Sequence, residues 1–337
     1  MTRIWLNHWF STAYHIIKLI KKGEDNLFII GSNERPDAVY KEVCDEFFTE
    51  PVLPPDEYAA YCLDFCIKHE IDVFLPRRGM LGVSKHMEEF AKAGIKVMAD
   101  SYDKLKTLNS KTEAYRLFSE NGIASVPDYF LVEDINDFRN AYIELSGRYD
   151  KVCFKKVSDE GGMSFRLIDD SYKGYHALFT PSRTRITYAE AEAALAERGT
   201  FPPLIMMPYL SGSEVSVDSL TTPSGKILLP RFKTPTRTEI VRFDPYILSV
   251  CEKFLDSYEL ECPCNIQFRF LGDTPYFLEV NTRMSGGVQL ACEACGVNLP
   301  NIAVNKLLGI EKPWSCEQRE HRISFVETPI PIAVPNS

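Results

Sequence analysis

The chain has 337 residues, which at about 150 residues per domain predicts two domains or three small ones with a substantial core. Hydrophobic residues make up 45% of the chain and charged residues 25%, a globular composition that excludes intrinsic disorder. The formal net charge of −9 argues against a nucleic-acid backbone or an anionic membrane as the main partner. We therefore expect neither a nucleic-acid nor a membrane partner.

The ends and the cysteines bear on the compartment. The first ten residues lack the continuous apolar stretch of a secretory signal. The longest segment without Lys, Arg or Asp, residues 284–305, contains Glu293 and Pro300, which is not typical of a membrane span. Ten cysteines occur without the spacing of a disulfide framework, so reduced thiols are expected. Together these features predict a cytoplasmic protein.

The first hundred residues alternate short apolar runs with amphipathic stretches, the pattern of βαβ units around a parallel sheet. Strands are predicted at residues 3–6, 27–31, 47–48, 71–75 and 95–98. Helices are predicted at residues 14–20, 58–70 and 84–93. Ser11 or Thr12 is expected to cap the first helix, and Gly23 to end it.

From residue 110 the pattern changes, and beyond residue 150 the strand-like segments are dense enough to indicate antiparallel sheet. Helices are predicted at residues 111–118, 134–145, 188–198 and 246–257, with another from residue 288. Strands are predicted at residues 151–157, 164–168, 204–209, 214–221, 226–232, 265–271 and 276–280. The tail from residue 329 is expected to be peripheral.

The turn after the first strand, residues 7–12, is bulky and aromatic. It lacks the Gly-x-Gly-x-x-Gly pattern, which disfavours a dinucleotide site. His8, Arg77 and Arg78 each follow a predicted strand, where ligands bind in open α/β sheets. A small-substrate pocket and ordinary surface loops are both compatible with these three residues.

A polar run in the last predicted strand suggests a metal site. Glu279 and Asn281 alternate with apolar residues, so their side chains project from one face. Gln267, on the preceding strand, can join them. A carboxylate and two amides form an oxygen set that suits Mg²⁺ completed by nucleotide phosphates. Arg283 would then lie where charge develops on a transferring phosphoryl group.

Two further segments suit a nucleotide. A strand ending near Lys155 leads into a loop with Gly161 and Gly162, whose backbone amides can hold phosphates. A β-hairpin with a glycine turn is the alternative for this segment. The apolar run at residues 204–210 offers backbone groups to a flat base, and Glu214 can accept from ribose hydroxyls.

In this order, the segments resemble the ATP-grasp superfamily, and in particular carboxylate-amine ligases similar to the carbamoyl-phosphate synthase large chain. The resemblance spans about residues 4–309. It implies a mixed α/β and α+β fold with an N-terminal Rossmann-like pre-ATP-grasp lobe at residues 1–105. An ATP-grasp domain at residues 106–320 would follow, with a lid subdomain at about 151–212 and a C-terminal antiparallel-sheet subdomain. Residues 321–337 would form a tail.

The resemblance also implies roles for single residues. Cofactor contacts would be Lys111, Lys155, Gly161, Gly162, Met207, Pro208, Tyr209, Leu210 and Glu214. Metal ligands would be Gln267, Glu279 and Asn281, and the catalytic cations Arg283, Lys155 and Lys111.

Three positions depart from the family's pattern. Ser110 replaces the Asp that usually precedes the lysine. Pro208 stands where a glutamate is common, so backbone groups of Met207 and of residues 209–210 are expected to recognise more of the base. The flap, residues 158–162, is acidic and has fewer glycines than many members, which bears on how tightly it closes over phosphates.

The implied reaction uses ATP with Mg²⁺, or with Mn²⁺ as an alternative ion, bound between the lid and the C-terminal sheet. A small-molecule carboxylate would attack the γ-phosphorus, and an amine would convert the acyl phosphate to an amide with release of ADP and phosphate. An ATP-binding regulatory module without turnover and a carboxylate or carbamate kinase-like phosphotransferase are the alternatives. A homodimer is compatible with the resemblance.

Two residue sets remain open between a functional and a structural interpretation. The cysteines at positions 262, 264, 292 and 295 could form a zinc site, but small core-filling side chains are favoured. Arg231, Arg237 and Arg242 could hold the substrate carboxylate or form a solvated basic face.

Overall fold

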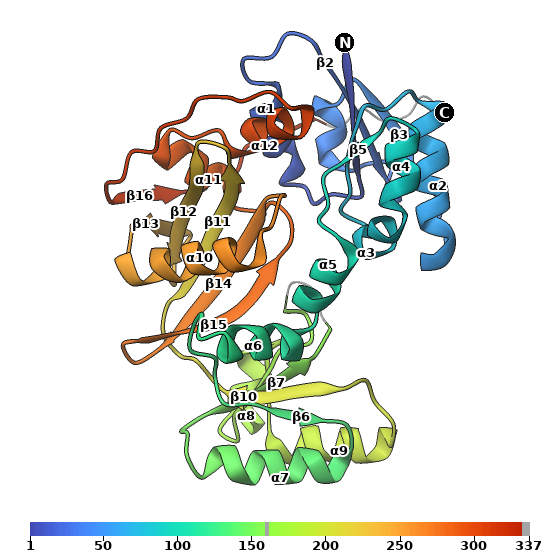
Figure 1. The fold of residues 1–337 in the computed structure, drawn as a ribbon. Coiled ribbons are helices and arrows are strands. Elements are labelled where there is room, and N and C mark those ends of the chain that lie inside the picture. Colours follow the sequence, from blue (N-terminus) through green and yellow to red (C-terminus); the bar gives the residue numbers. More distant parts are fainter. Residues whose placement is uncertain (159–161, 332–337) are drawn as a thin grey trace. The chain divides into compact units, whose positions relative to one another are not determined.

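The structure is a computed structural model that describes residues 1–158 and 162–331, and it divides into two compact units (Figure 1). The first unit comprises residues 1–108, 214–267 and those from 280 onward. The second comprises residues 109–213 and 268–279. Strands β14 (Cys264–Leu271) and β15 (Thr274–Asn281) therefore belong partly to each unit.

The first unit begins with a parallel five-stranded sheet in the order β3-β2-β1-β4-β5. Its strands are β1 (Thr2–Asn7), β2 (Leu27–Asn33), β3 (Glu46–Thr49), β4 (Val73–Leu75) and β5 (Lys96–Val97). Its helices are α1 (Ala13–Lys21), η1 (Val39–Val43), α2 (Pro55–Lys68), α3 (Met80–Val83), η2 (Ser84–His86), α4 (Met87–Lys92) and α5 (Tyr102–Asn109). The parallel α/β lobe predicted from the sequence is confirmed.

Some local details of this lobe differ from the prediction. The helix expected at residues 84–93 is divided between η2 and α4, and α3 and α5 were not predicted. Thr12 precedes α1, but its side chain makes no capping hydrogen bond. Packing of α1, which buries Ile16, Ile17 and Ile20, is therefore its main stabilisation.

Alternation along β1 divides the parallel sheet between two cores. Ile4 and Leu6 enter one core, while Trp5 enters the other, where it stacks on Phe65 and Phe74 with ring centroids 4.2 and 4.3 Å apart. A strand whose side chains are apolar on both faces is typical of a parallel sheet that is covered on both faces.

The second sheet has six strands in the order β15-β14-β11-β12-β13-β16. Besides β14 and β15, its strands are β11 (Glu214–Thr222), β12 (Gly225–Lys233), β13 (Thr238–Val241) and β16 (His321–Ser324). Its helices are α10 (Pro245–Tyr258), α11 (Val288–Cys295) and α12 (Leu299–Leu308). The β11–β12, β12–β13 and β13–β16 pairs are antiparallel, as expected, although β13 and β16 were not predicted.

One continuous core joins the parallel sheet, the helices α1, α11 and α12, and strands β11 and β12. Ile17 of α1, Val288 of α11 and Leu229 of β12 are all fully buried in it. Polar contacts fix the same layer, since Asn301 of α12 donates to the Ile20 carbonyl at 3.0 Å.

The second unit contains a mixed sheet in the order β6-β10-β7-β8-β9. Its strands are β6 (Phe130–Val132), β7 (Val152–Lys156), β8 (Arg166–Ile168), β9 (Arg185–Ile186) and β10 (Leu204–Pro208). Its helices are α6 (Lys111–Glu120), α7 (Ile135–Ser146), α8 (Gly174–Phe179) and α9 (Tyr188–Arg198). In Figure 1, α7 and α9 lie together along one side of this unit.

The faces of this sheet have different environments. Val152 and Phe154 of β7 pack in the core that includes α7 and α9, whereas Cys153 belongs to a separate apolar cluster. Met206 and Met207 of β10 divide in the same way.

Across the described residues, no helix is both long enough and apolar enough to cross a bilayer.

Candidate functional site

Lys111 and Glu279 form an ion pair inside the second unit. Lys111 is the first residue of α6, which Ser110 caps by accepting a hydrogen bond from the Glu113 backbone at 3.5 Å. The Lys111 Nζ lies 3.8 Å from Glu279 Oε2 and 3.5 Å from the Val157 carbonyl oxygen. The side chain of Lys111 is only 7% exposed and that of Glu279 27%. The structure thus brings a predicted phosphate contact to a predicted metal ligand.

The face of the second unit's sheet away from α7 and α9 carries the other predicted lysine. Because side chains alternate along a strand, Lys155 projects from the same face of β7 as Cys153. Lys155 is opposite Ile205 of β10 in the antiparallel register.

The predicted base-binding segment contributes Met207, Tyr209 and Leu210 to an apolar cluster that lies wholly within the second unit. Its members, buried or partly buried, are Cys153, Leu167, Met207, Leu210, Tyr129, Phe165, Tyr209, Leu271, Tyr276 and Leu278. Apolar side chains of this kind suit the flat faces of a base.

One backbone group of the predicted base-binding segment is already paired within the protein. The Tyr209 N–H donates to the Lys151 carbonyl at 2.8 Å, so this donor is already engaged in the structure. The Pro208 carbonyl accepts from Cys153 Sγ at 3.7 Å. Backbone recognition of a base by residues 207–210 stays a prediction.

Only part of the predicted flap lies in the described residues, since Gly161 falls outside them. Gly162 has a φ of +66°, in the left-handed region that favours glycine, and its carbonyl accepts from the Phe165 N–H at 3.1 Å. Ser164 Oγ accepts from the Lys156 N–H at 2.9 Å, which joins the end of β7 to the segment before β8.

Gln267 is oriented by a chain of hydrogen bonds in the first unit. Its Nε2 donates to Asn265 Oδ1 at 2.9 Å, and Asn265 Nδ2 donates to Asp218 Oδ1 at 2.9 Å. Asp218 in turn accepts from Arg231 Nε at 3.0 Å. Because this chain engages the Gln267 nitrogen as donor, Oε1 is the atom that a metal ion would use.

The remaining predicted residues follow along β15 and just beyond it. Glu279 and Asn281 are two positions apart on this strand and share a face. Arg283 follows the strand, and its guanidinium carbon lies 5.1 Å from the centroid of the Phe10 ring. A carboxylate and two amide oxygens suit Mg²⁺, so the donor chemistry of the three residues fits the implied ion.

Glu214, predicted to contact the ribose, begins β11 and forms an ion pair with Lys233 of the neighbouring strand β12. Val215 pairs with Phe232 in the register of these two strands, so Glu214 lies one residue before the first paired position of β11. A ribose would have to compete with Lys233 for this carboxylate.

Arg231 has a different role from the one considered for it. The side chain is 2% exposed, and it donates to Asp218, to Glu239 and, at 2.9 Å, to Ser285 Oγ. Gly287 lies so close that a Cβ there would be 2.4 Å from Arg231 Nη1. Arg231 is thus a buried structural cation, because its donors are engaged by protein groups.

The other two arginines of that segment lie in separate surroundings. Arg237 pairs with Glu327 at 2.6 Å, and both side chains are exposed. Arg242 lies over the Phe232 ring at 4.2 Å. The three arginines do not form one group.

Sequence reasoning missed Tyr115, which is completely buried and donates to Met207 Sδ at 3.8 Å. Burial raises the pKa of Tyr115, and the charge of Glu279 raises it further. Tyr115 thus contacts the predicted base-binding segment, and the charge of Glu279 acts on it. Its spacing four residues after Lys111 on one helix face was the available signal.

The four cysteines considered for zinc, Cys262, Cys264, Cys292 and Cys295, are all buried. Burial raises the pKa of Cys292 to about 12, which disfavours the thiolate that a metal needs. Within the described ranges, no cluster of three or more His, Cys, Asp or Glu is arranged to hold a metal ion.

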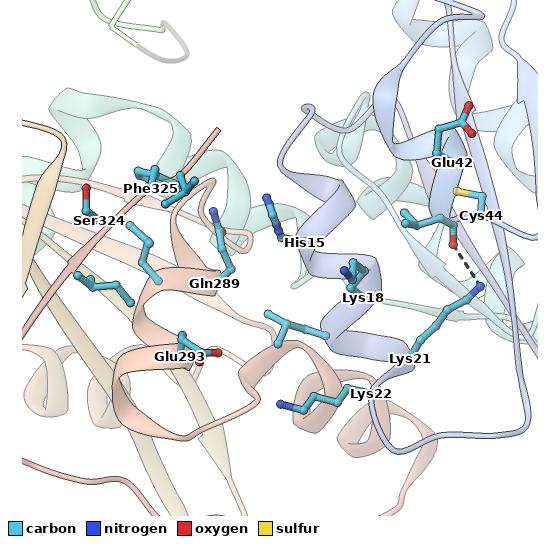
Figure 2. Close-up of a pocket in the computed structure, with 15 residues that line it drawn as sticks. His15, Lys18, Lys21, Lys22, Glu42, Cys44, Gln289, Glu293, Ser324 and Phe325 are labelled. Carbon is cyan, nitrogen blue, oxygen red and sulfur yellow. Dashed lines mark hydrogen bonds between the residues drawn. The ribbon is translucent and has the colours of Figure 1, made fainter. Parts of the chain in front are cut away.

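A separate cavity of about 830 Å³ lies between α1, η1, α11 and the segment at β16. Figure 2 shows Lys18 and Lys21 of α1 on one side of it and Gln289 and Glu293 of α11 on the other. Lys21 is held by the Val43 carbonyl at 3.1 Å and by Asp45. No residue predicted for the nucleotide site lines this cavity.

Comparison with known proteins bears on the family. The model of a family described as "ATP-grasp in the biosynthetic pathway with Ter operon" matches residues 200–328. The arginine-specific large chain of carbamoyl phosphate synthase from Geobacillus stearothermophilus is 24% identical over 325 residues. The match covers 89% of this chain but only 28% of that relative's length. The chain thus spans under a third of the curated relatives it matches.

Solved structures show the same fold at low identity. N5-carboxyaminoimidazole synthetase from Staphylococcus aureus, complexed with ADP, aligns with a TM-score of 0.72 at 14% identity. That alignment covers 96% of this chain and 82% of the synthetase. The biotin carboxylase domain of the Hydrogenobacter thermophilus 2-oxoglutarate carboxylase, with MgADP, ADP and bicarbonate, gives 0.71 at 16% identity, covering 94% and 72%. The predicted resemblance to ATP-grasp proteins is confirmed by these similarities, and the chain has the fold of these solved structures.

Proposed function

We propose that the protein is an ATP-dependent carboxylate-amine ligase that works through an acyl phosphate. The observation that carries the proposal is the Lys111–Glu279 ion pair. A lysine suited to phosphates and a carboxylate suited to a metal lie 3.8 Å apart, so a metal nucleotide bound here would meet both. The carbamoyl phosphate synthase relative and the ADP-bound neighbours support the same class of reaction.

We assign Glu279, Asn281 and Gln267 as the groups that would hold Mg²⁺, or Mn²⁺. When bound, the ion would neutralise charge on the phosphates. Lys111, Lys155 and Arg283 would stabilise charge on the transferring phosphoryl oxygens. The apolar cluster around Met207 would take the base, and Glu214 the ribose.

The proposed reaction has two steps, phosphoryl transfer to the carboxylate and attack of the amine on the acyl phosphate. A carboxylate oxygen attacks the γ-phosphorus, the bond to the β-phosphate oxygen breaks, and ADP leaves. The amine nitrogen then attacks the acyl carbon, phosphate leaves with the bonding electrons, and the nitrogen loses a proton. Because water would hydrolyse the acyl phosphate, the lid subdomain proposed at about residues 151–212 would exclude it.

Two other functions are distinguishable from this one. A kinase-like phosphotransferase would release ADP without an amine, and a regulatory module would bind ATP without turnover. The intact run of Glu279, Asn281 and Arg283 favours an enzyme over the module.

All ten cysteines are free thiols in the structure, which supports our proposal of a cytoplasmic location. A homodimer remains a prediction.

The test measures ADP release with MgATP against a panel of small carboxylates, each with and without an amine. We expect ADP formation that needs both a carboxylate and an amine. Amine-independent ADP would support the kinase, and MgATP binding without ADP release the module. The Asp273→Asn variant is a matched control, because Asp273 is an exposed residue in the turn between β14 and β15.

A further inference from the structure

The parallel sheet of the first unit has a topological switch point, where the order of adding strands changes from one side of β1 to the other. From β1 the chain adds β2 and β3 on one side, and it then adds β4 and β5 on the other. The loops that follow β1 and β4 therefore leave adjacent strands at the same carboxyl edge. In open α/β sheets, ligands bind in the crevice at this switch point.

A buried side chain ties these two loops together. Asn7, fully buried at the end of β1, accepts from the Arg77 N–H at 2.6 Å. Its Nδ2 donates to the Arg78 carbonyl at 3.1 Å and to the Tyr58 hydroxyl at 2.9 Å. The position of Arg77 is thus set by the end of β1.

Glu50 fixes the loop after β1 through hydrogen bonds. Its buried carboxylate accepts from the His8 N–H at 3.0 Å, from Ser32 Oγ at 2.7 Å and from the Tyr58 hydroxyl at 2.5 Å. A carboxylate that accepts three hydrogen bonds rigidifies the groups that donate them. The loops are therefore preorganised.

The same loop retains features that folding alone does not favour. His8 has a φ of +43°, in the left-handed region that non-glycine residues rarely adopt. His8 Nδ1 and Thr12 Oγ1 are buried atoms with no hydrogen-bond partner in the described parts of the chain. Backbone strain and buried polar atoms without partners both concentrate at functional sites.

Phe10 connects these loops with the predicted phosphate-binding arginine. Its ring, 43% exposed, lies under the Arg77 guanidinium at 4.3 Å and near the Arg283 guanidinium at 5.1 Å. Arg78, by contrast, pairs with Glu34 and lies over Tyr58. A guanidinium over a ring presents its N–H donors in its own plane, the geometry that matches a carboxylate.

We propose that the loops after β1 and β4 bind the carboxylate group of the substrate, with Arg77 as its charged contact and Phe10 as a positioning residue. This inference rests on the proposed ligase function. Since Arg77 and Arg283 share one ring, a carboxylate held by Arg77 would lie beside the arginine assigned to the transferring phosphoryl group.

The kinetic test compares Arg77→Gln with Arg319→Gln, an exposed arginine of the same unit paired with Glu317. Carboxylate dependence is measured as ADP release with ammonium chloride as the amine and bicarbonate, acetate, L-alanine or L-aspartate as the carboxylate. Arg77→Gln should raise the carboxylate KM by about 10–100-fold, whereas the calorimetric Kd for MgATP should change less than about twofold. Phe10→Leu should raise KM more than it lowers kcat. An unchanged carboxylate KM in Arg77→Gln would overturn the inference.

A second measurement uses the unaltered protein and does not depend on turnover. Phenylglyoxal labelling of Arg77, followed by peptide mass spectrometry, should slow in the presence of the carboxylate and not with MgATP alone. Protection of Arg77 without carboxylate-dependent ADP release would leave this site standing and contradict the ligase function. Carboxylate-dependent ADP release with no protection would contradict the site and leave the function standing. Absence of both would contradict both.

Discussion

The Lys111 ammonium lies 3.8 Å from the Glu279 carboxylate, with the lysine almost completely buried at the start of α6 and the glutamate near the end of β15. The pair has a structural and a proposed functional consequence. In the protein the two charges compensate each other, and with a metal nucleotide each would gain a new partner. Tests of this pair therefore come first.

Glu279→Gln should lower turnover by about 10²–10³-fold, because it removes the only carboxylate from the proposed metal set. Steady-state ADP release at saturating MgATP measures this. Asp273→Asn, in the same hairpin, should retain activity. Activity of Glu279→Gln at the level of this control would contradict the assignment of the metal site.

A double-mutant cycle with Lys111→Met and Glu279→Gln tests the ion pair itself. Each single variant should lose roughly 1–3 kcal/mol of unfolding free energy, because it leaves one partly buried charge without its partner. The double variant should lose less than the sum of the two, as measured by urea unfolding. Strict additivity would show that the two side chains are not coupled.

Arg231→Met should cost roughly 3–5 kcal/mol of unfolding free energy, since it leaves the buried Asp218 and the partly buried Glu239 without their shared cation. Arg237→Met, at an exposed ion pair, should cost less than about 1 kcal/mol. Urea unfolding of both variants provides the comparison. Equal losses would mean that the buried network does not stabilise the fold.

Gly212→Ala should destabilise the second unit by about 1–3 kcal/mol, because the new Cβ would lie 2.8 Å from the Phe270 carbonyl oxygen. Gly147→Ala is the matched control, with a negative φ and its nearest atom 3.4 Å away. Thermal unfolding of the two variants measures the difference. A Gly212→Ala protein as stable as Gly147→Ala would show that the Gly212–Phe270 approach can relax.

Glu24 predicts a pH dependence of stability. Its hydrogen bond to Lys312, with smaller contributions from Asn301 and Asn305, lowers the pKa of Glu24 below 4.5. A carboxyl with a lower pKa in the folded state stabilises it above the unfolded pKa, and this contribution is lost as pH falls through the folded pKa. Glu24→Gln should therefore be less stable than the parent at pH 7, with the difference shrinking in acid. A pH-independent difference would contradict this linkage.

How far the sequence predicts the site depends on the kind of information a residue carries. The alternation of Glu279 and Asn281 is visible in the sequence, because a strand has a period of two. The burial of Arg231 was not predictable, because its partners Asp218 and Glu239 come from the strands on either side of β12. The role of Tyr209 in pairing with Lys151 likewise depends on a strand contact that no local pattern specifies.

The same reasoning applies to the fold. Long periodic segments such as α7 and α9 were predicted nearly to the residue, and in the structure Asp134 and Thr187 cap their N-termini. Strands β13 and β16 are short and pair with each other, so tertiary packing more than local pattern determines them. The domain boundaries proposed from the resemblance stay predictions.

The most direct test of the central claim follows oxygen from the carboxylate to the phosphate. Carboxylates labelled with oxygen-18 are incubated with the protein, MgATP and an amine, and the released phosphate is analysed by mass spectrometry. The acyl-phosphate account predicts that each phosphate released with ADP carries one labelled oxygen from the substrate. ADP formation with unlabelled phosphate would contradict it, because the γ-phosphoryl group would then have passed to water.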